Sequence, residues 1–369
     1  MNEVPEQIDP RPWLAAARGG ARREDAMRAL ASDEPGPREL AALLSPAAGA
    51  LLEPMARRAQ ALTRRHFGRT VQLYVPLYLS SHCPGGCLYC GFASDRAAPR
   101  HRLEPEQSED EMDALKSMGF EEVLLLTGER CPGADYAYVR DCVARAARHF
   151  HNVNVEVFPM ETGEYRGLAE AGCSGLTLYQ ETYDPGRYER FHRWGPKRDY
   201  RARLDAPERA LRAGLRFAGL GALLGLSDPR YDLLALYRHA AALRKQYWRS
   251  GISISFPRIR DQEGGFRPDF PVSDRELAQF IYAFRLCLPD VPLVLSTRER
   301  PALRDGMAGV GISKMSVASR TTVGGYSGRT QYSEGQFEVS DGRGIDEFCA
   351  MLRAANLEPV FKNWEAVYR

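Results

Sequence analysis

Three cysteines on one short loop carry the strongest chemical signal in this sequence. Cys83, Cys87 and Cys90 lie within residues 82–91, directly after the apolar segment 73–79. Three thiolates at this spacing can bind three irons of a [4Fe-4S] cluster, which leaves the fourth iron without a protein ligand. An open iron can bind a small molecule, whereas four protein ligands favour electron transfer or a structural role. The loop therefore predicts an iron–sulfur site that takes part in chemistry.

A zinc site is the main alternative for these thiols. His82 or His101 could complete a Cys3His set around a zinc ion. Structural zinc sites usually combine a Cys-x2-Cys pair with a second, distant pair, and the sequence contains no second pair of that kind. The pattern favours the cluster, and a zinc- or cluster-stabilised binding module without catalysis stays open as a hypothesis.

The elements that must position this loop follow a regular alternation. Short apolar or β-branched segments, each followed by a helical pattern, indicate eight strands at residues 72–79, 122–127, 153–157, 175–179, 216–223, 253–256, 293–296 and 313–317. Eight such units in a row predict an α/β fold, a closed (βα)8 barrel of the TIM type. Functional groups of such barrels come from the carboxyl ends of the strands, and the cysteine loop follows the first strand.

The chain divides into two parts in this interpretation. Residues 1–70 are rich in Ala and Arg, with helical patterns at 16–30 and 51–67, and we expect an N-terminal helical extension. Residues 71–369 are expected to form the barrel with a C-terminal segment.

Composition and charge exclude several classes of function. The 50 basic and 48 acidic side chains give a net charge of +2, so nothing suggests a nucleic-acid partner. The sequence contains no run of 18 apolar residues, so we expect no membrane span. The N-terminus lacks the basic and apolar regions of a secretory signal. We expect a cytoplasmic protein with buried, reduced thiols at the scattered cysteines Cys131, Cys142, Cys173, Cys287 and Cys349.

The cysteine spacing, with Tyr89 before the third cysteine, resembles the radical S-adenosylmethionine (SAM) superfamily. In that superfamily the open iron binds the amine and carboxylate of SAM, and one electron from the reduced cluster releases a 5′-deoxyadenosyl radical. The resemblance implies that the three cysteines bind a [4Fe-4S] cluster and that Tyr89 lies at the cofactor.

Three further features fit a SAM site. The turn at 127–129 resembles the superfamily's Gly-Gly-Glu turn, which implies that Glu129 meets the SAM ammonium; Thr replaces the first glycine here. Arg203 resembles the arginine that meets the SAM carboxylate in biotin-synthase-like members. Gly219 and Gly221 lie in the expected fifth strand, and we expect them to let the backbone approach the adenosine.

Longer strings extend the resemblance beyond the cysteines, in chain order and at expected strand ends: 75–80, 179–183, 219–228, 253–258, 295–299 and 324–326. Together they resemble the 2-iminoacetate synthase family, the tyrosine lyases of thiamine thiazole biosynthesis. The resemblance implies that the radical takes a hydrogen from the amino group of L-tyrosine and that the Cα–Cβ bond breaks. The products would be 2-iminoacetate (dehydroglycine) and p-cresol, with 5′-deoxyadenosine and methionine. Thiazole synthase and a flavodoxin-type reductant are the implied partners.

A tyrosine substrate sets demands that strand ends can meet. Its carboxylate requires an arginine, and Arg298, after the seventh strand, resembles the carboxylate-binding arginine of aromatic amino-acid lyases. Ser316 could accept a hydrogen bond from the amine. Gln180 and Glu181 could meet ribose, amine or phenol, and Arg258 could face SAM or the substrate.

Two other enzymatic interpretations stay open: a different aromatic amino-acid radical lyase, such as one that cleaves tryptophan, and a deazaflavin-forming synthase. Formation of p-cresol separates the tyrosine lyase from both. The related hydrogenase maturase carries an extra cysteine-rich C-terminal segment, whereas Cys349 stands alone here, so formation of cyanide and carbon monoxide is not expected.

Overall fold

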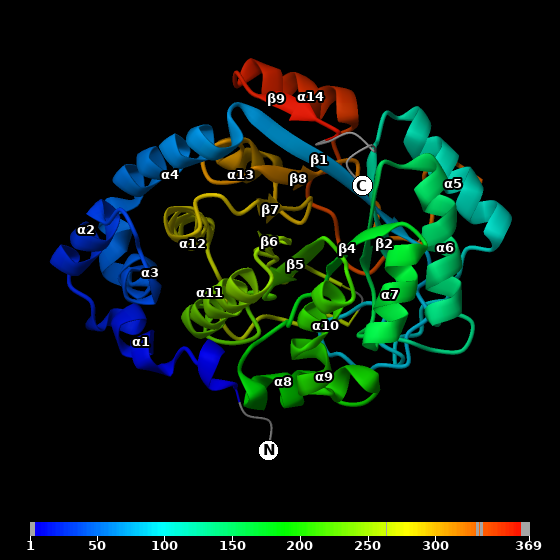
Figure 1. Ribbon diagram of the computed structural model, residues 1–369, viewed down its shortest axis with the longest axis horizontal. Coiled ribbons are helices and arrows are strands. Elements are labelled where there is room, and N and C mark those ends of the chain that lie inside the picture. Colours follow the sequence, from blue (N-terminus) through cyan, green and yellow to red (C-terminus); the bar gives the residue numbers. More distant parts are fainter. Residues whose placement is uncertain (1–3, 263, 330–331, 333–334, 363–369) are drawn as a thin grey trace.

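Eight parallel strands close into a barrel in the computed structural model, which describes residues 4–262, 264–329, 332 and 335–362 (Figure 1). Each strand pairs with the next along the chain, and the eighth pairs with the first. The predicted (βα)8 barrel is therefore confirmed. Its strands are β1 (Thr70–Tyr78), β2 (Glu122–Leu126), β3 (Asn152–Glu156), β4 (Cys173–Thr177), β5 (Phe217–Gly221), β6 (Gly251–Ser255), β7 (Leu293–Leu295) and β8 (Lys314–Ser316).

The strands are short and buried on both faces, as parallel strands covered by helices must be. All five residues of β2 are buried, and helices surround the barrel on its outside. The covering helices are α5 (Pro105–Ser117), α6 (Tyr136–His149), α7 (Thr162–Glu170), α8 (Pro185–Phe191), α9 (Tyr200–Leu204), α10 (Ala206–Arg212), α11 (Pro229–Gln246), α12 (Asp274–Cys287), α13 (Pro301–Met307) and α14 (Ile345–Ala354).

Acidic and hydroxyl side chains fix where several of these helices begin. Their oxygens accept hydrogen bonds from free N–H groups of the first helical turn, which stabilises the helix starts that follow the carboxyl ends of the strands. The capping residues are Asp135, Asp184, Asp199, Asp228 and Ser273, at the N-termini of α6, α8, α9, α11 and α12.

The N-terminal segment packs against one side of the barrel. The predicted helix at 16–30 was wrong in its extent: α1 (Arg11–Ala15) and α2 (Arg23–Ala31) are separated at Gly19, whose φ of 142° is not helical. On the left of Figure 1, α1, α3 (Pro37–Leu44) and α4 (Leu52–Phe67) pack against α11 or α12, and α2 packs against α3. Their buried side chains join the same hydrophobic cluster as the barrel.

One strand was not predicted. β9 (Glu358–Val360) pairs with residues 70–72 of β1, outside the closed barrel, beside α14 at the top of Figure 1. Pro359 has no N–H to donate, and proline is tolerated on such an edge strand. The proline and the length of three residues hid this strand from the sequence pattern.

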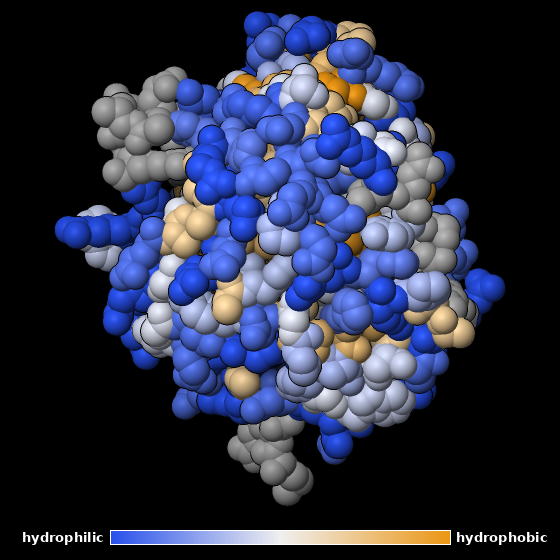
Figure 2. All heavy atoms as spheres, turned by 90° about the vertical axis from the view of Figure 1, so that its right-hand side faces the viewer, coloured by the Kyte–Doolittle hydropathy of each residue, from blue (hydrophilic) through white to orange (hydrophobic). Residues whose placement is uncertain are grey.

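The side of the molecule that carries α5, α6 and α7 is mostly hydrophilic, with small scattered apolar spots (Figure 2). Among the described residues, no helix is both long and apolar enough to cross a membrane.

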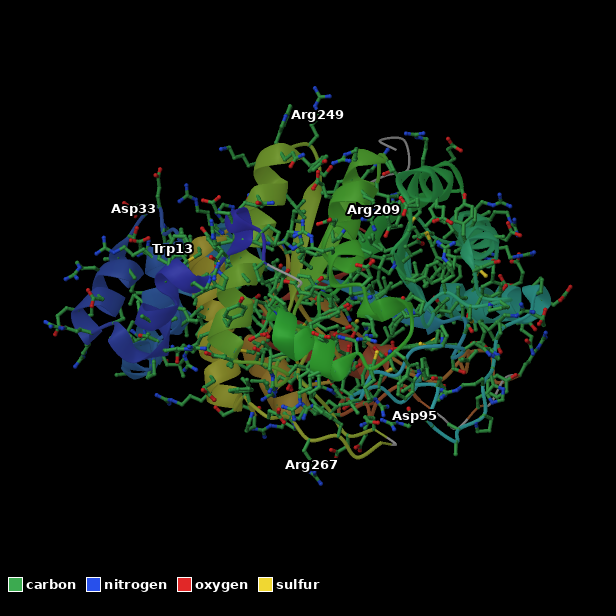
Figure 3. The ribbon with its side chains drawn as sticks, turned by 90° about the horizontal axis from the view of Figure 1, so that it is seen from below. Trp13, Asp33, Asp95, Arg209, Arg249 and Arg267 are labelled. Atoms are coloured by element: carbon green, nitrogen blue, oxygen red, sulfur yellow. The ribbon has the colours of Figure 1, made fainter. Side chains whose placement is uncertain are left out.

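Loops from distant parts of the chain meet over the carboxyl ends of the strands. The loop that bears Asp95, after β1, lies along the same edge as the loop that bears Arg267, after β6 (Figure 3). The two loops touch, because a Cβ at Gly264 would lie 2.1 Å from Arg96 Nη2. The segment after β8 also reaches the cysteine loop, where the Gly91 N–H donates to the Gln336 carbonyl at 3.1 Å.

Candidate active site

The cysteine loop lies at the carboxyl end of β1, as the barrel predicts. A Cβ at Gly85 would lie 3.5 Å from Cys83 Sγ and 3.9 Å from Cys87 Sγ, so both sulfurs flank this glycine. Burial raises the pKa of Cys83 to about 11 and that of Cys87 further, so neither thiol would ionise near neutral pH without a cationic ligand. This environment suits thiolates bound to iron and does not suit free nucleophiles.

Backbone and side-chain N–H groups point at two of the sulfurs. The Glu129 N–H donates to Cys83 Sγ at 3.4 Å, and the Phe92 N–H donates to Cys90 Sγ at 3.4 Å. Gln336 Nε2 lies 3.8 Å from Cys90 Sγ. Hydrogen bonds of this kind to ligand sulfurs tune iron–sulfur clusters, so the surroundings of the loop fit such a group.

The described side chains do not form a zinc site around the cysteine loop. In the part of the chain that the structure describes, no three His, Cys, Asp or Glu side chains converge as ligands of a single metal ion. The ligands of a cubane do not need to converge in this way, since each thiolate binds a different iron. His101, one suggested fourth ligand, instead stacks on Tyr332 with ring centroids 3.5 Å apart.

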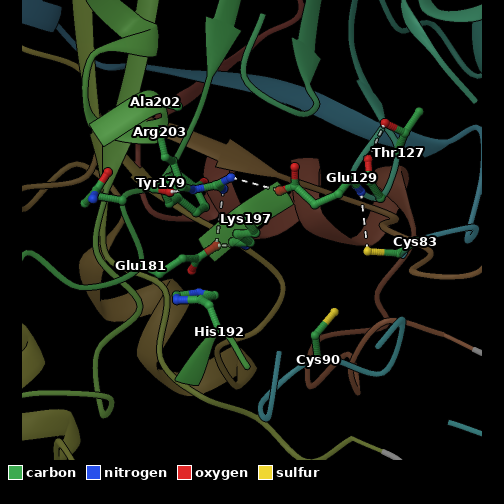
Figure 4. A network of polar contacts seen from close by, with 12 residues as sticks. Cys83, Cys90, Thr127, Glu129, Tyr179, Glu181, His192, Lys197, Ala202 and Arg203 are labelled. Atoms are coloured by element: carbon green, nitrogen blue, oxygen red, sulfur yellow. Dashed lines mark hydrogen bonds and ion pairs between the residues drawn. The ribbon is translucent and has the colours of Figure 1, made fainter. Parts of the chain in front are cut away.

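The turn after β2 packs directly on the cysteine loop. A Cβ at Gly128 would lie 2.4 Å from the His82 carbonyl oxygen and 2.7 Å from Cys83 Cβ, so only glycine fits there. This close approach brings Glu129 beside Cys83 (Figure 4). Glu129 Oε2 is buried and has no hydrogen-bond partner among the described residues. A buried carboxylate oxygen requires a donor, and the ammonium group of SAM is a donor of the right kind.

Arg203 joins two acidic side chains at the mouth of the barrel. Its Nη1 lies 3.1 Å from Glu129 Oε1, its Nη2 lies 3.4 Å from Glu181 Oε1, and its Nε donates to the Tyr179 carbonyl at 2.7 Å (Figure 4). Each terminal nitrogen carries two N–H groups, so a second donor on each is available to a carboxylate ligand. The predicted pair of Glu129 and Arg203 is thus brought together.

Lys197 completes this network, and the sequence analysis missed it. Lys197 Nζ lies 2.6 Å from Glu181 Oε1 and 5.6 Å from the centre of the Tyr89 ring. Burial opposes the ionisation of Glu181, but Lys197 and Arg203 hold its pKa below the usual range. Glu181 has a φ of 68°, a left-handed conformation that turns its side chain toward these cations.

Tyr89 is held by His192 from the segment after α8. Its hydroxyl lies 2.7 Å from His192 Nε2, while His192 Nδ1 lies 2.7 Å from the Tyr188 carbonyl oxygen. Because only Nδ1–H can donate to a carbonyl, Nε2 accepts from the tyrosine hydroxyl. Burial and the nearby Lys197 lower the pKa of His192 to about 3, so the imidazole is neutral.

Two adjoining cavities open among these residues. The cofactor-side cavity, of about 530 Å³, is lined by Tyr89, Cys90, Glu181 and Lys197, among others. The inner cavity, of about 600 Å³, lies further down the barrel. The two share one set of lining residues, which we call the junction: Glu156, Tyr179, Pro257, Arg298, Gln336 and Phe337.

Arg298 and Ser316 both line the inner cavity, and their contact with a substrate stays a prediction. The Arg298 guanidinium carbon lies 3.3 Å from the centre of the Phe337 ring, so the ring holds the cation at the junction. Ser316 Oγ accepts the Thr297 N–H at 3.2 Å, a bond that ties β8 to the loop after β7.

Two predicted site residues point elsewhere. Arg258 Nε donates to Glu299 at 3.0 Å, Nη1 donates to the Val272 carbonyl at 2.8 Å, and Nη2 pairs with Asp274 at 2.7 Å and with Glu299. Gln180 Nε2 donates to the Tyr200 carbonyl at 3.4 Å. Neither side chain is among the described residues that line the two cavities. The structure thus gives both side chains partners within the protein, and their contact with the cofactor or the substrate stays a prediction.

Gly219 and Gly221 make room for side chains of the neighbouring strand. A Cβ at Gly219 would lie 2.7 Å from Thr177 Oγ1, and one at Gly221 would lie 2.6 Å from the Tyr179 ring. Barrel packing therefore explains why glycine occupies both positions. Their contact with adenosine stays a prediction.

Comparison with known proteins agrees with this geometry. Residues 77–236 match the model of the Radical SAM superfamily, and residues 255–358 match the Biotin and Thiamin Synthesis associated domain. A crystal structure of HydG, a maturase of the [FeFe]-hydrogenase, superposes with a TM-score of 0.90 at 29% identity, over 98% of this chain and 81% of that one. Methylornithine synthase (PylB) shares the fold, with a TM-score of 0.71 at 22% identity, over 91% of this chain and 97% of that one.

The barrel, the cysteine loop and the matched models define a radical SAM enzyme. Such enzymes use a [4Fe-4S] cluster and SAM, and the three thiols and the free oxygen of Glu129 fit these two groups. The 2-iminoacetate synthase of Escherichia coli (strain K12) is 41% identical over 348 residues, 94% of this chain and 92% of that protein. The chain belongs to the 2-iminoacetate synthase family.

Proposed function

We propose that this protein is a 2-iminoacetate synthase that cleaves the Cα–Cβ bond of L-tyrosine to 2-iminoacetate and p-cresol, with 5′-deoxyadenosine and methionine as the other products. The observation that carries the proposal is the pair of adjoining cavities, with a cysteine of the cluster loop on one side and Arg298 at the junction. The 41% identity to a 2-iminoacetate synthase over nearly the whole chain supports the same reaction.

The cofactor-side cavity suits SAM. Cys83, Cys87 and Cys90 would hold the cluster, Glu129 would receive the SAM ammonium and Arg203 its carboxylate. When bound, the cluster and SAM supply a 5′-deoxyadenosyl radical that removes a hydrogen atom from the tyrosine amino group. The network of Arg203, Glu181 and Lys197 keeps these charges fixed before the ligand arrives, so little reorganisation is needed.

The inner cavity suits an aromatic amino acid. Arg298 offers a guanidinium for the carboxylate, and below it the wall is mostly aromatic or aliphatic, with Tyr74, Tyr78, Leu124, Leu126, Phe256 and Val294. An apolar wall favours an aromatic ring and keeps water away from reactive intermediates. Hydroxyl groups of Ser255, Ser316 and Thr321 also line this cavity and can hydrogen-bond polar atoms of the substrate.

The physiological setting follows from the proposed reaction. The reaction consumes electrons, so a small reductant of the flavodoxin type would serve the cluster. Thiazole synthase would receive 2-iminoacetate for the thiazole of thiamine. We place the protein in the cytoplasm, where thiols stay reduced.

Anaerobic turnover tests the proposal. The reconstituted enzyme, with about four irons per chain, is incubated with a reductant, SAM and L-tyrosine. We expect p-cresol, 5′-deoxyadenosine and glyoxylate, the hydrolysis product of 2-iminoacetate, in comparable amounts. L-Tryptophan and reactions without SAM serve as controls. Cleavage of tryptophan in place of tyrosine, or 5′-deoxyadenosine without p-cresol, would reject the tyrosine lyase.

A further inference from the structure

Glu156 is a charged residue in the active site to which no role has been assigned. It ends β3, across the barrel from β7, and it lines both cavities together with Arg298. No hydrogen bond or ion pair of its carboxylate appears among the described residues, whereas Glu181 is tied to Lys197 and Arg203 and Glu129 to Arg203. Glu156 lies inside the barrel, and the two cavities that it lines leave its side chain partly accessible.

The proposed function sets the orientation of the substrate. The hydrogen atom is taken from the amino group, so the amine of tyrosine must lie at the junction, next to the cofactor-side cavity. The aromatic ring then occupies the apolar part of the inner cavity. At the junction, Arg298 and Glu156 are the two oppositely charged side chains, and they match the carboxylate and the ammonium of an amino-acid zwitterion.

We propose, on the basis of that function, that Glu156 binds the α-ammonium group of the substrate and accepts its proton. The ammonium passes one proton to the Glu156 carboxylate, giving a neutral amine and a neutral carboxylic acid, with no change in total charge. The neutral amine is the form from which an N–H hydrogen atom is removed. Homolytic cleavage of the Cα–Cβ bond then leaves the C=N bond of 2-iminoacetate, and the side chain departs as a 4-hydroxybenzyl radical that takes up one electron from the reductant and one proton to give p-cresol.

The surroundings of Glu156 suit a proton acceptor. Burial raises the pKa of Glu156 to about 7, and the charge of Glu181 raises it too, while Arg298, Arg203 and Lys197 lower it. Tyr74, Tyr78 and Tyr179 also face this carboxylate, and burial raises the pKa of all three, so they stay neutral. A base with a pKa near 7 can both accept and release a proton at physiological pH.

Binding without turnover tests the inference. The reconstituted enzyme with SAM, but without a reductant, is dialysed against L-tyrosine, against 3-(4-hydroxyphenyl)propionate, which lacks the amine, and against L-phenylalanine, which lacks the hydroxyl. We expect Glu156→Gln to weaken binding of tyrosine and of phenylalanine at least tenfold, and to change binding of the deamino acid less than twofold. Glu189→Gln, on the exposed face of α8, is the matched control and should change none of the three.

Several outcomes would overturn the inference. If Glu156→Gln weakens the binding of tyrosine but not that of phenylalanine, the carboxylate contacts the phenol hydroxyl. If Glu156→Gln weakens the binding of all three ligands equally, or of none, Glu156 does not recognise the amine. Iron content and a Glu156→Asp variant, which should keep part of the preference for the amine, guard against a folding defect.

Turnover provides a second readout that separates this inference from the proposed function. The wild-type rate should fall below about pH 7 as Glu156 becomes protonated, and Glu156→Gln should have a lower rate without this acid limb. If the wild type does not cleave tyrosine, the proposed function fails. If it does, and Glu156→Gln keeps both its affinity and its acid limb, the inference about Glu156 alone fails.

Discussion

Arg203 and Glu129 form a buried ion pair at the mouth of the barrel, with Arg203 Nη1 3.1 Å from Glu129 Oε1. They come from α9 and from the turn after β2, and the pair leaves Glu129 Oε2 without a partner among the described residues. One carboxylate thus serves two purposes: one oxygen anchors the arginine, and the other, although buried, can accept a hydrogen bond from an incoming donor.

This pair predicts a combined loss of stability and cofactor binding in Arg203→Ala. The variant leaves Glu129 and Glu181 as buried charges with fewer partners, and breaking such a pair costs about 3–5 kcal/mol. We expect the free energy of unfolding, measured in urea, to fall by about 3 kcal/mol and SAM binding, measured by equilibrium dialysis, to weaken more than tenfold. Arg201→Ala, an exposed position on the same helix, should change neither. Unaltered SAM binding in Arg203→Ala would contradict the assignment.

The cysteine loop predicts which thiols hold iron. Cys87→Ala should lose most of its iron and the brown absorbance of the cluster after anaerobic reconstitution, and with them all p-cresol formation. Cys349→Ala, a buried thiol on α14 far along the chain from the loop, should keep about four irons per chain and normal turnover. A Cys87→Ala protein with full iron content would show that the ligands were wrongly assigned.

Two arginines show what the sequence can and cannot reveal. Arg258 and Arg298 both follow barrel strands, so the rule that strand ends carry function marked both. Arg298 reaches the cavities, whereas Glu299 and Asp274, residues far from Arg258 in sequence, take up its donors. Strand order follows from local patterns, but the partner of a long side chain depends on three-dimensional packing.

The site residues that the sequence analysis did not name also differ in how much local signal they carry. Lys197 lies in a broken helical region where no pattern marks it, and only the fold brings it 2.6 Å from Glu181. Glu156 did carry a signal, because it is an acidic residue at the end of an apolar strand. Gln336 and Phe337 reach the junction from a long segment after β8, whose path no local pattern encodes.

The contrast between these arginines can be measured. Arg298→Lys keeps a cation but loses the two-pronged contact with a carboxylate, and we expect the KM for tyrosine to rise roughly thirtyfold, equivalent to about 2 kcal/mol. Its unfolding free energy should change by less than about 0.5 kcal/mol. Arg258→Lys should show the reverse, with about 2 kcal/mol less stability and a nearly unchanged KM. Equal effects on KM in both variants would mean that both arginines contact the substrate.

Asp232 predicts a pH dependence of stability. It lies buried on α11, where Oδ1 accepts from the Tyr183 N–H at 2.7 Å and from Thr182 Oγ1 at 2.9 Å, while Oδ2 has no partner among the described residues. Burial raises the pKa of Asp232 to about 8, above the usual 3.8. The folded protein therefore holds a proton that the unfolded chain releases, and stability falls as the pH rises from about 4 to about 8.

Asp232→Asn should remove this dependence. An asparagine keeps the accepting oxygen for Tyr183 and Thr182, and its amide does not ionise. The variant should gain unfolding free energy over the wild type as the pH rises, by up to about 1.4 kcal/mol per pH unit, and level off above about pH 8. Urea unfolding of both proteins at pH 5, 6.5 and 8 measures this difference and cancels the contributions of His192 and His239, whose pKa values burial lowers. A difference that is constant with pH would mean that Asp232 is ionised in the folded protein throughout this range.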